Sequence, residues 1–289
     1  MTESQRQLVV GYQGSEGAYS QLAAAEHFSE ASPTVRCQGF HSFREMLEAL
    51  EAGEVDYAVL PIENSIAGSI NESYDLLAEK GLSLVGEVFQ PVAHCLIGAT
   101  AVPVSGIRRI YSHPVALAQC GEFLGTLEDC HVEAFPDTAM AVEKVKRDAD
   151  PTQAAIASEQ AAELHGLPII RRELADHPEN YTRMVIVAPE PAHHSPDVPC
   201  KTSLVFSTTH EKGALARCIS LFAERGLNLT KIESRPKPDT PFEYIFYMDF
   251  EGSIDGATTQ EALQELRTVT TFLTVLGSYP SQTISPMNV

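Results

Sequence analysis

The chain has 289 residues, of which 44% are hydrophobic, and this length accommodates two or three domains that each have a core. Its 20 basic and 39 acidic residues give a formal net charge of −19, which opposes binding to nucleic acid or to an anionic membrane surface. No apolar run approaches the roughly 18 residues that a membrane span requires. A small anionic ligand would therefore have to be held by local hydrogen-bond donors, because the overall field repels it.

The N-terminus and the cysteines both predict a cytoplasmic protein. The polar stub at residues 1–7 leads directly into an apolar run, which predicts no signal peptide. The cysteines are scattered and form no C-x-x-C pair, so we expect reduced, mostly buried thiols and no metal site. The adjacent His193 and His194 could ligate a metal, but they stand in a proline-rich loop and are interpreted as solvent-exposed. The six cysteines are Cys37, Cys95, Cys120, Cys130, Cys200 and Cys218.

The first 188 residues alternate strand-like and helix-like segments, which predicts an α/β architecture with helices layered on sheets. The apolar run 8–13 leads through a glycine-rich turn to a helical segment, and the run 55–65 precedes another. Residues 83–99 are predicted to form paired strands. Three further strand-to-helix units are predicted within residues 107–127, 131–148 and 154–170.

A linker and a second domain are predicted after these segments. Residues 188–200 hold four prolines in thirteen positions and fit neither helical nor strand periodicity. Beyond them the pattern reads strand, helix, strand, strand, helix, strand, which is the ferredoxin-like arrangement. The predicted segments are 202–209, 211–226, 227–236, 242–252, 258–270 and 272–280.

Four strand-to-helix junctions of the first domain are rich in hydrogen-bond donors. They are GSEGAYS (14–20), PIENSIAGSI (61–70), SHPVALAQC (112–120) and PDTAMA (136–141). Helix N-termini present unpaired backbone N–H groups and partial positive charge, so they bind anions without lysine or arginine. Four such junctions at one crevice outside the strand ends would form a cage for an anion.

Each junction also has a plainer interpretation. Ser112 and Asp137 are ordinary helix N-caps, and Pro114 suits a first helical turn. The turn 14–20 matches neither a dinucleotide nor a P-loop fingerprint. The Glu63-Asn64-Ser65 cluster favours function more strongly, because it follows a buried apolar run and serves no core purpose.

A fifth polar patch precedes the apolar run 184–188. Asn180, Thr182 and Arg183 supply an amide, a hydroxyl and a guanidinium, and the guanidinium could bind a carboxylate through two parallel hydrogen bonds. A strand-edge threonine and a surface arginine are the alternative interpretation. Taken alone, the patch favours that alternative, and only the four donor-rich junctions, which suit the same kind of ligand, weaken it.

Together the motifs GSEGAYS, PIENSIAGSI, SHPVALAQC, PDTAMA and NYTRM, followed by GALARCISLF and ESRP, resemble prephenate dehydratase with a C-terminal ACT regulatory domain. The resemblance spans nearly the whole chain in the same motif order. It implies a catalytic region of two lobes with periplasmic-binding-protein-like topology and an active site between them. Residues 1–188 are then the catalytic domain, with lobes at roughly 1–95 plus 180–188 and at 96–179. Residues 189–200 are the linker, 201–280 the ACT domain and 281–289 a tail.

The resemblance implies conversion of prephenate to phenylpyruvate, water and carbon dioxide in phenylalanine biosynthesis, without a cofactor. The family's Thr-Arg-Phe motif falls on Thr182, Arg183 and Met184, and its essential threonine is Thr182. Thr182 is expected to act as a positioned donor or relay, with Glu63 and Asn64 as further catalytic residues. The residues expected to bind substrate are Gly17, Ala18, Tyr19, Ser65, Ser69, Ser112, His113, Thr138, Asn180 and Arg183.

Two positions depart from the family pattern. Met184 stands where phenylalanine is usual, and Val115 stands where glutamine is usual in the Ser-His-Pro-Gln motif. Neither change removes a proposed catalytic group, but both leave the substrate preference open. Arogenate dehydratase, which acts on a substrate with an amine in place of the keto group, uses the same motifs and is the main alternative. A non-catalytic anion-binding sensor on the same fold is a further alternative.

The resemblance also implies phenylalanine as an allosteric effector at subunit interfaces of a homodimer or homotetramer. The expected contact regions are the GAL motif and residues 228–236. A small residue at the start of the GAL helix would let a ligand approach the backbone, and ESRP could hold the charged ends of an amino acid. The expected effector-binding residues are Gly213, Ala214, Leu215, Asn228, Leu229, Glu233, Ser234 and Arg235.

Overall fold

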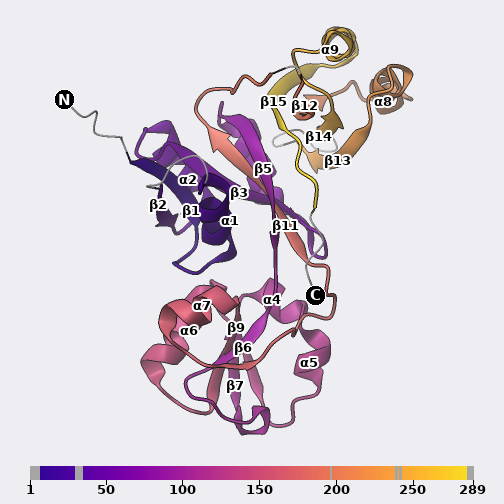
Figure 1. Cartoon of the computed structure of the whole chain (residues 1–289). Coiled ribbons are helices and arrows are strands. Elements are labelled where there is room, and N and C mark those ends of the chain that lie inside the picture. Colours follow the sequence, from indigo (N-terminus) through magenta and orange to yellow (C-terminus); the bar gives the residue numbers. More distant parts are fainter. Residues whose placement is uncertain (1–6, 30–34, 196, 238–239, 241–242, 285–289) are drawn as a thin grey trace, which may run out of the picture. The chain divides into compact units, whose positions relative to one another are not determined.

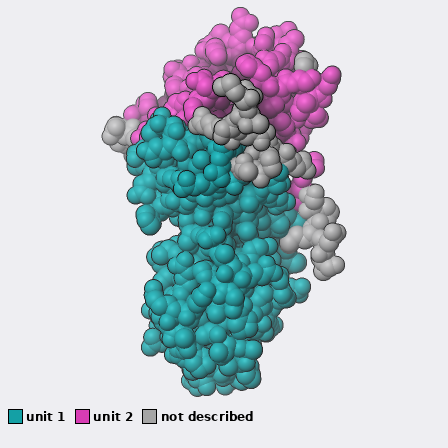
Figure 2. Space-filling view, turned by 60° about the vertical axis from the view of Figure 1, so that its left-hand side comes forward, with its two compact units in different colours: residues 1–68, 89–184, 285–289 teal, residues 69–88, 185–284 magenta. Residues whose placement is uncertain are grey.

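The computed structural model describes residues 7–29, 35–195, 197–237, 240 and 243–284, and within them the strands form three sheets (Figure 1). The chain divides into two compact units, one of residues 1–68 and 89–184 and one of residues 69–88 and 185–284 (Figure 2). Phe242, at the start of a predicted strand, and residues 285–289 of the predicted tail lie outside the described residues.

The first sheet has six strands in the order β2-β1-β3-β11-β5, with β4 paired to β3. Strand β1 runs parallel to both β2 and β3, so the strand ends that lead into helices lie at one edge of the sheet. Strands β5 and β11 each begin in one unit and end in the other. The elements are β1 (Leu8–Gln13), β2 (Val35–Phe40), β3 (Tyr57–Asn64), β4 (Gly68–Ser69), β5 (Ser83–Pro91), β11 (Tyr181–Ala188), α1 (Tyr19–Phe28), α2 (Phe43–Glu51) and α3 (Asn71–Glu79).

The second sheet belongs to the first unit and has the order β10-β6-β9-β7-β8. Its inner strands β6 and β9 are buried on both faces, and Leu96 and Ile97 on β6 enter two different core clusters. The elements are β6 (Cys95–Gly98), η1 (Val104–Gly106), β7 (Arg109–Ser112), α4 (Pro114–Ala118), α5 (Gly121–Gly125), β8 (His131–Ala134), α6 (Thr138–Asp148), β9 (Gln153–Ala157), α7 (Glu159–His165) and β10 (Ile169–Arg171).

The prediction of paired strands in residues 83–99 is wrong. Strand β5 belongs to the first sheet and β6 to the second, and the chain crosses between the sheets at residues 92–94. Two short apolar runs separated by a turn are compatible with a hairpin, and the sequence alone did not show that their partners lie far away in the chain. This crossing creates the two-lobed catalytic fold, with one sheet in each lobe, that the resemblance predicted.

The third sheet is the ferredoxin-like ACT sheet, with the antiparallel order β13-β14-β12-β15. Leu204, Phe206, Met248 and Phe250 alternate along their strands and pack beneath helices α8 and α9, as the period of two predicts. The elements are β12 (Cys200–Ser207), α8 (Ala214–Glu224), β13 (Leu229–Pro236), β14 (Tyr244–Glu251), α9 (Ala257–Val269) and β15 (Phe272–Pro280).

The opposite face of the third sheet is covered by residues 69–88, which lie in the same unit. The ring centroids of Tyr74 on α3 and Tyr247 on β14 are 4.9 Å apart. Gly277 on β15 lies so close to β5 that a Cβ atom there would be 2.1 Å from the carbonyl oxygen of Leu84. At the central strand β12 both faces of the sheet are therefore covered, and every residue of β12 is buried.

Strand β2 and helix α2 were not predicted, although α2 has a clear start signal. The Ser42 side chain accepts a hydrogen bond from the backbone of Glu45, and the Glu45 carboxylate accepts one from the backbone of His41. This pattern is a variant of the S-x-x-E capping box. Met46, Leu47 and Leu50 follow at helical spacing and are buried.

Candidate active site

The ends of β3 and β11 bring an amide and a hydroxyl together within the first unit. Asn64 donates from Nδ2 to Asn180 Oδ1 at 2.8 Å and to Thr182 Oγ1 at 3.1 Å. The two strands are joined beside this contact, where the backbone N–H of Ser65 donates to the carbonyl of Tyr181 at 2.8 Å. The strand pairing therefore assembles two sequence motifs that lie more than a hundred residues apart.

The orientation of the Asn64 amide is fixed from its oxygen side. Asn64 Oδ1 accepts hydrogen bonds from the backbone N–H groups of Ala67 at 2.8 Å and Ile66 at 3.0 Å, and from Gln119 Nε2 at 3.1 Å. A flipped amide would place an NH₂ group against these donors. The NH₂ group must therefore face Thr182.

The hydroxyl of Thr182 accepts a hydrogen bond from Asn64 and keeps its own proton. A hydroxyl has one proton and two lone pairs, and the bond from Asn64 uses a lone pair. Because Thr182 is only partly buried, its proton can be directed to a ligand. An amide neighbour that donates cannot remove that proton, so this geometry favours a donor over a nucleophile.

Gln119 supports both asparagines and was not among the predicted site residues. Besides its bond to Asn64, it accepts at Oε1 from Asn180 Nδ2 at 3.0 Å and contacts His94 Nε2 at 2.8 Å. It is buried at the C-terminal end of the short helix α4. Its position within the quoted motif SHPVALAQC was a usable signal, but its partners come from distant parts of the chain.

His94 and Tyr19 complete the network behind Gln119. Gln119 Oε1 is an acceptor, so His94 must carry a proton on Nε2. Burial lowers the pKa of His94 and so favours the neutral ring. The hydrogen bond to Gln119 opposes this shift. The Tyr19 hydroxyl donates its proton to the carbonyl of Ala93 at 2.6 Å, and its oxygen lies 3.2 Å from His94 Nδ1. Burial raises the pKa of Tyr19 well above its usual value, so the network carries no formal charge.

The glycine-rich turn 14–20 contacts the second lobe through Asp137. The backbone N–H of Ser15 donates to Asp137 Oδ2 at 3.2 Å, and Asp137 also caps α6 by accepting from Ala139 at 2.6 Å. Gly14 has φ +113°, and a Cβ atom there would lie 2.5 Å from Asp137 Oδ2. Asp137 therefore acts as a cap and as a link to the turn. Thr138, a predicted site residue, is the first residue of α6 and is partly buried.

Gly17 makes a second contact between the lobes. Ser158 donates from Oγ to the carbonyl of Gly17 at 3.0 Å, and a Cβ atom at Gly17 would lie 3.1 Å from the Cα of Ala161. The φ of Gly17 is +92°, which also disfavours any other residue. The predicted site residues Gly17, Ala18 and Tyr19 thus lie where the first lobe meets the second, with Ala18 as the N-cap of α1.

The residues of the Ser-His-Pro motif differ in burial and in hydrogen bonding. Ser112 is fully buried and donates to the carbonyl of Ile156 at 2.5 Å, which is a structural bond. His113 is partly exposed at the N-cap of α4 and accepts at Nδ1 from the backbone of Val115 at 3.3 Å. Burial lowers the pKa of His113, and the charge of Asp137 opposes this shift. Val115 is exposed, so its replacement of glutamine changes a surface rather than the core.

Arg183 and Glu63 neighbour the cluster along their strands. Successive strand residues point to opposite faces, so Arg183 and Thr182 point to opposite sides of β11, and Glu63 and Asn64 to opposite sides of β3. The Arg183 side chain is buried and that of Glu63 is partly buried. Binding of a carboxylate by Arg183 stays a prediction.

The structure does not bring Ser65 and Ser69 into the amide cluster. The Ser65 hydroxyl accepts from the backbone N–H of Tyr181 at 3.0 Å and thereby supports the strand pair. Ser69 lies in the second unit, where it donates to Glu233 Oε2 at 2.6 Å and accepts from Lys231 Nζ at 3.1 Å. Its predicted role in substrate binding remains untested.

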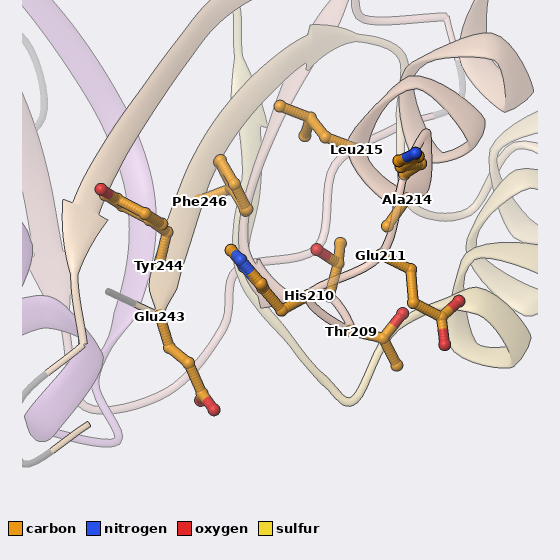
Figure 3. Close-up of a pocket in the computed structure, with 10 residues that line it drawn as sticks. Thr209, His210, Glu211, Ala214, Leu215, Glu243, Tyr244 and Phe246 are labelled. Carbon is orange, nitrogen blue, oxygen red and sulfur yellow. The ribbon is translucent and has the colours of Figure 1, made fainter. Parts of the chain in front are cut away.

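In the second unit, the start of α8 forms part of a pocket of about 350 Å³ (Figure 3). Gly213 caps the helix with φ +78°, and Ala214 and Leu215 of the GAL motif line the pocket. Their role in effector binding stays a prediction. The lining combines ionisable and aromatic side chains, which suits an amino acid. The other lining residues are Thr208, Thr209, His210, Glu211, Lys212, Glu243, Tyr244 and Phe246.

The remaining predicted effector residues lie on or beside β13 and have partners within the same unit. Arg235 binds Asp75 with Nε and Nη2 at 3.3 and 2.8 Å, and this hydrogen bond raises the pKa of the guanidinium. Glu233 accepts from Ser69 as described above. Asn228 donates to Glu251 at 3.2 Å. Leu229 begins β13 and is partly buried, and Ser234 is exposed.

No group of three or more His, Cys, Asp or Glu side chains is placed to hold a metal ion in the part of the chain that the structure describes. Among the described helices, none is both long and apolar enough to cross a membrane.

Comparisons with known proteins agree with this arrangement. The sequence model of prephenate dehydratase matches residues 10–192, and that of the ACT domain matches residues 202–268. A bifunctional chorismate mutase/prephenate dehydratase of Enterobacter agglomerans is 38% identical over 96% of this chain and 72% of that protein. The arogenate dehydratase/prephenate dehydratase 2 of Arabidopsis thaliana is 43% identical over 95% of this chain and 73% of that protein.

Solved structures share the fold over nearly the whole chain. A prephenate dehydratase of Arthrobacter aurescens in complex with L-Phe is 28% identical, with a TM-score of 0.86 over 95% of this chain and 90% of that chain. A protein described as a quorum quenching acylase is 35% identical, with a TM-score of 0.84 over 95% of this chain and 98% of that chain.

Proposed function

This chain belongs to the prephenate dehydratase family, and we propose that the Asn64–Thr182 pair is the centre at which prephenate becomes phenylpyruvate, water and carbon dioxide. The observation that carries this proposal is the 3.1 Å hydrogen bond from Asn64 Nδ2 to Thr182 Oγ1. It occupies a lone pair of the hydroxyl and leaves the proton for the substrate. Gln119 and the backbone beyond Asn64 hold the amide in the orientation that this bond requires.

The reaction breaks two bonds of the substrate ring. The bond between the ring and its carboxylate breaks, and its electron pair enters the ring while the bond from carbon to the ring hydroxyl breaks. The hydroxyl takes a proton and leaves as water, and the carboxylate leaves as carbon dioxide. Because a threonine is a poor free acid, Thr182 acts as a positioned donor or relay toward the leaving oxygen. Glu63, which was predicted to assist, points to the side of β3 opposite Asn64 and takes no direct part in this step.

An uncharged network suits this elimination. A cation beside the ring carboxylate would stabilise the ground state, whereas the electrons of that carboxylate must drive the reaction. Neutral side chains position the Thr182 hydroxyl without adding charge; they are Asn64, Asn180, Gln119 and His94. The pyruvyl carboxylate does not react and so can be held by a cation. Arg183 is the predicted anchor, although strand alternation directs it to the side of β11 opposite Thr182, and the kinetics of Arg183→Lys decide whether it contacts the substrate.

The first experiment measures turnover by the purified full chain. Prephenate should yield a keto acid with strong absorbance in alkali, and Thr182→Ala should abolish most of this signal while remaining folded. Parallel assays with arogenate, which would yield phenylalanine, decide between the two substrates, because a relative at 43% identity is named for both activities. A folded chain that turns over neither substrate would overturn the proposal and favour a binding protein.

We further propose that phenylalanine binds the ACT domain and inhibits the enzyme. A relative with a TM-score of 0.86 was solved in complex with L-Phe, and the pocket beside α8 offers ionisable and aromatic groups. Should the effector also use Glu233 and Arg235, it would have to displace Ser69 and Asp75 from them. Inhibition of prephenate turnover by phenylalanine in the full chain tests this regulation.

The predicted domain boundaries, a homodimer or homotetramer, and a cytoplasmic location complete the proposal. The family matches at residues 10–192 and 202–268 support boundaries near 188 and 201. A chain ending near Pro191 would nevertheless lose the sheet that covers Glu87, whose side chain is fully buried. Regulation is therefore better tested by point substitutions in the full chain than by truncation.

A further inference from the structure

Residues 69–88, which contain α3 and the first part of β5, pack on the ACT sheet. Helix α3 and the first part of β5 lie in the second unit, while the chain before and after them lies in the first unit. Arg235 on β13 binds Asp75, and Tyr247 on β14 packs against Tyr74. The segment therefore belongs structurally to the ACT sheet, although its two ends lead to Asn64 on one side and His94 on the other.

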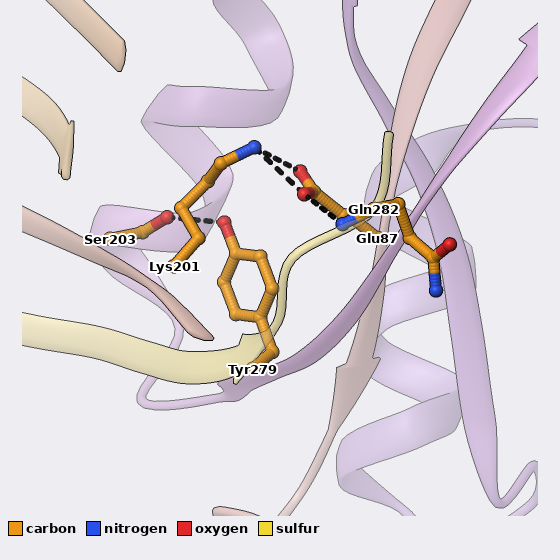
Figure 4. Close-up of polar contacts among 5 residues, drawn as sticks. All are labelled: Glu87, Lys201, Ser203, Tyr279 and Gln282. Atoms are coloured by element: carbon orange, nitrogen blue, oxygen red, sulfur yellow. Dashed lines mark hydrogen bonds and ion pairs between the residues drawn. The ribbon is translucent and has the colours of Figure 1, made fainter. Parts of the chain in front are cut away.

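A buried ion pair fastens β5 to this sheet (Figure 4). Lys201 Nζ on β12 lies 2.7 and 2.8 Å from the two carboxylate oxygens of Glu87, and the side chains are 8% and 0% exposed. The backbone N–H of Gln282, just beyond β15, donates to Glu87 Oε1 at 3.0 Å. Beside the pair, the hydroxyls of Ser203 and Tyr279 link β12 and β15 at 2.6 Å. One carboxylate of β5 thus receives donors from two ACT strand segments.

Stability alone is a weak explanation for this pair. Removing two charges from water costs free energy, and apolar pairs of similar volume often hold a core as well as a buried ion pair does. The paired charges do fix which atoms of β5 face which atoms of the sheet. The close contact of Gly277 with Leu84 reinforces this register, because no side chain fits between them.

Strand β5 continues from the ion pair into the catalytic network. Glu87 lies at the middle of β5, and two residues later the strand passes into the first unit at Phe89. Just beyond it, the backbone N–H of Val92 donates to the carbonyl of Asn180 at 2.8 Å. His94 then contacts Gln119. A displacement of β5 along its axis would therefore move the supports of the Asn64 amide.

We propose that the Glu87–Lys201 ion pair is a regulatory joint that ties the ACT sheet to the strand supporting the catalytic amide cluster. A change in the sheet on effector binding moves β5 through this joint and alters the support of Asn180 and Asn64. The inference rests on the proposed inhibition by phenylalanine. Coupling of this kind requires the effector to favour one arrangement of the sheet. The coupling is the ratio of the effector's affinities for the inhibited and the active states of the enzyme.

The test compares phenylalanine binding and inhibition in the wild-type chain and in the double variant Glu87→Gln/Lys201→Met. The double substitution removes both charges together, so neither is left buried without its partner. We expect near wild-type kcat and KM without effector, phenylalanine affinity retained in calorimetry, and inhibition weakened about tenfold, within the usual range of allosteric coupling. A merely structural role would lower stability without separating binding from inhibition.

The matched control is Arg225→Met/Glu265→Gln, which removes a partly exposed ion pair from the same unit. This control should keep full inhibition. A double variant at Glu87 and Lys201 that binds phenylalanine and is inhibited like the wild type overturns the joint and leaves the proposed regulation intact. A wild-type chain that phenylalanine neither binds nor inhibits overturns both.

Discussion

The most direct test of the catalytic geometry is Thr182→Val, which keeps the shape of the side chain and removes its hydroxyl. The structure separates the expected loss of activity from the loss of stability. In this variant Asn64 Nδ2 still has acceptors in Asn180 Oδ1 at 2.8 Å and the carbonyl of Tyr181 at 3.2 Å. The amide therefore does not become a buried donor without a partner, and the free energy of unfolding should fall by only about 0.5–1.5 kcal/mol.

The kinetic effect should be larger. Loss of positioned proton-transfer help lowers turnover by roughly 10²–10⁴-fold. That range corresponds to about 2.7–5.4 kcal/mol of activation free energy, since each factor of ten is about 1.36 kcal/mol. The substrate makes other contacts, so the change should fall on kcat more than on KM.

The assay follows phenylpyruvate formation from prephenate by absorbance in alkali, with urea unfolding measured on the same preparations. Thr182→Ser is the matched control, because it keeps a hydroxyl in reach of Asn64 and should retain most of the turnover. If Thr182→Val turned over prephenate at the parent rate while folded, the donor role of Thr182 would be refuted.

Three further predictions concern other parts of the fold. Burial lowers the pKa of His94, so the unfolded state binds more protons and the free energy of unfolding should decrease as pH falls below about 6.5. In urea unfolding between pH 5 and 8, this free energy should depend less steeply on pH in His94→Gln than in the parent chain, and an equal dependence would contradict the assignment. Arg183→Lys should raise the KM for prephenate with little change in kcat, because an ammonium cannot form two parallel bonds to a carboxylate; unchanged constants would place the anchor elsewhere. Gly277→Ala should lower the free energy of unfolding by about 3 kcal/mol, since its Cβ would lie 2.1 Å from the Leu84 oxygen. The control Gly81→Ala, with no atom within 4 Å of the added Cβ, should have little effect, and equal denaturant midpoints for the two variants would refute the packing argument.

The sequence predicted those features that depend on short segments. Strand and helix periodicity predicted the α/β region and the ferredoxin-like ACT sheet, because burial on one or both faces leaves a readable pattern along each element. Donor-rich residues at strand ends predicted that Asn64, Asn180 and Thr182 belong to one neighbourhood. Their hydrogen bonds show this proximity, although a role in catalysis still awaits the experiments above.

Features that depend on distant partners could not be read from the sequence. The run 83–99 resembled paired strands, but β5 and β6 join different sheets through partners elsewhere in the chain. Gln119 stands within the quoted motif SHPVALAQC and His94 within the run 83–99, but only the fold places their polar atoms 2.8 Å apart. The Glu87–Lys201 pair joins residues 114 positions apart, and neither residue stands in a recognisable motif.

The location of charge in the molecule unifies these observations. The chain carries a net charge of −19, yet the amide cluster beneath Thr182 is built from neutral side chains, with His94 kept neutral by burial. The buried charges of Glu87 and Lys201 lie instead in the second unit, where each neutralises the other. A charge within the amide cluster would bind the reacting carboxylate and oppose its departure, whereas a charge pair in β5 only fixes the position of the strand. The amide cluster thus positions a hydroxyl without adding its own charge, while the Glu87–Lys201 pair uses strong electrostatics to fix the position of a strand.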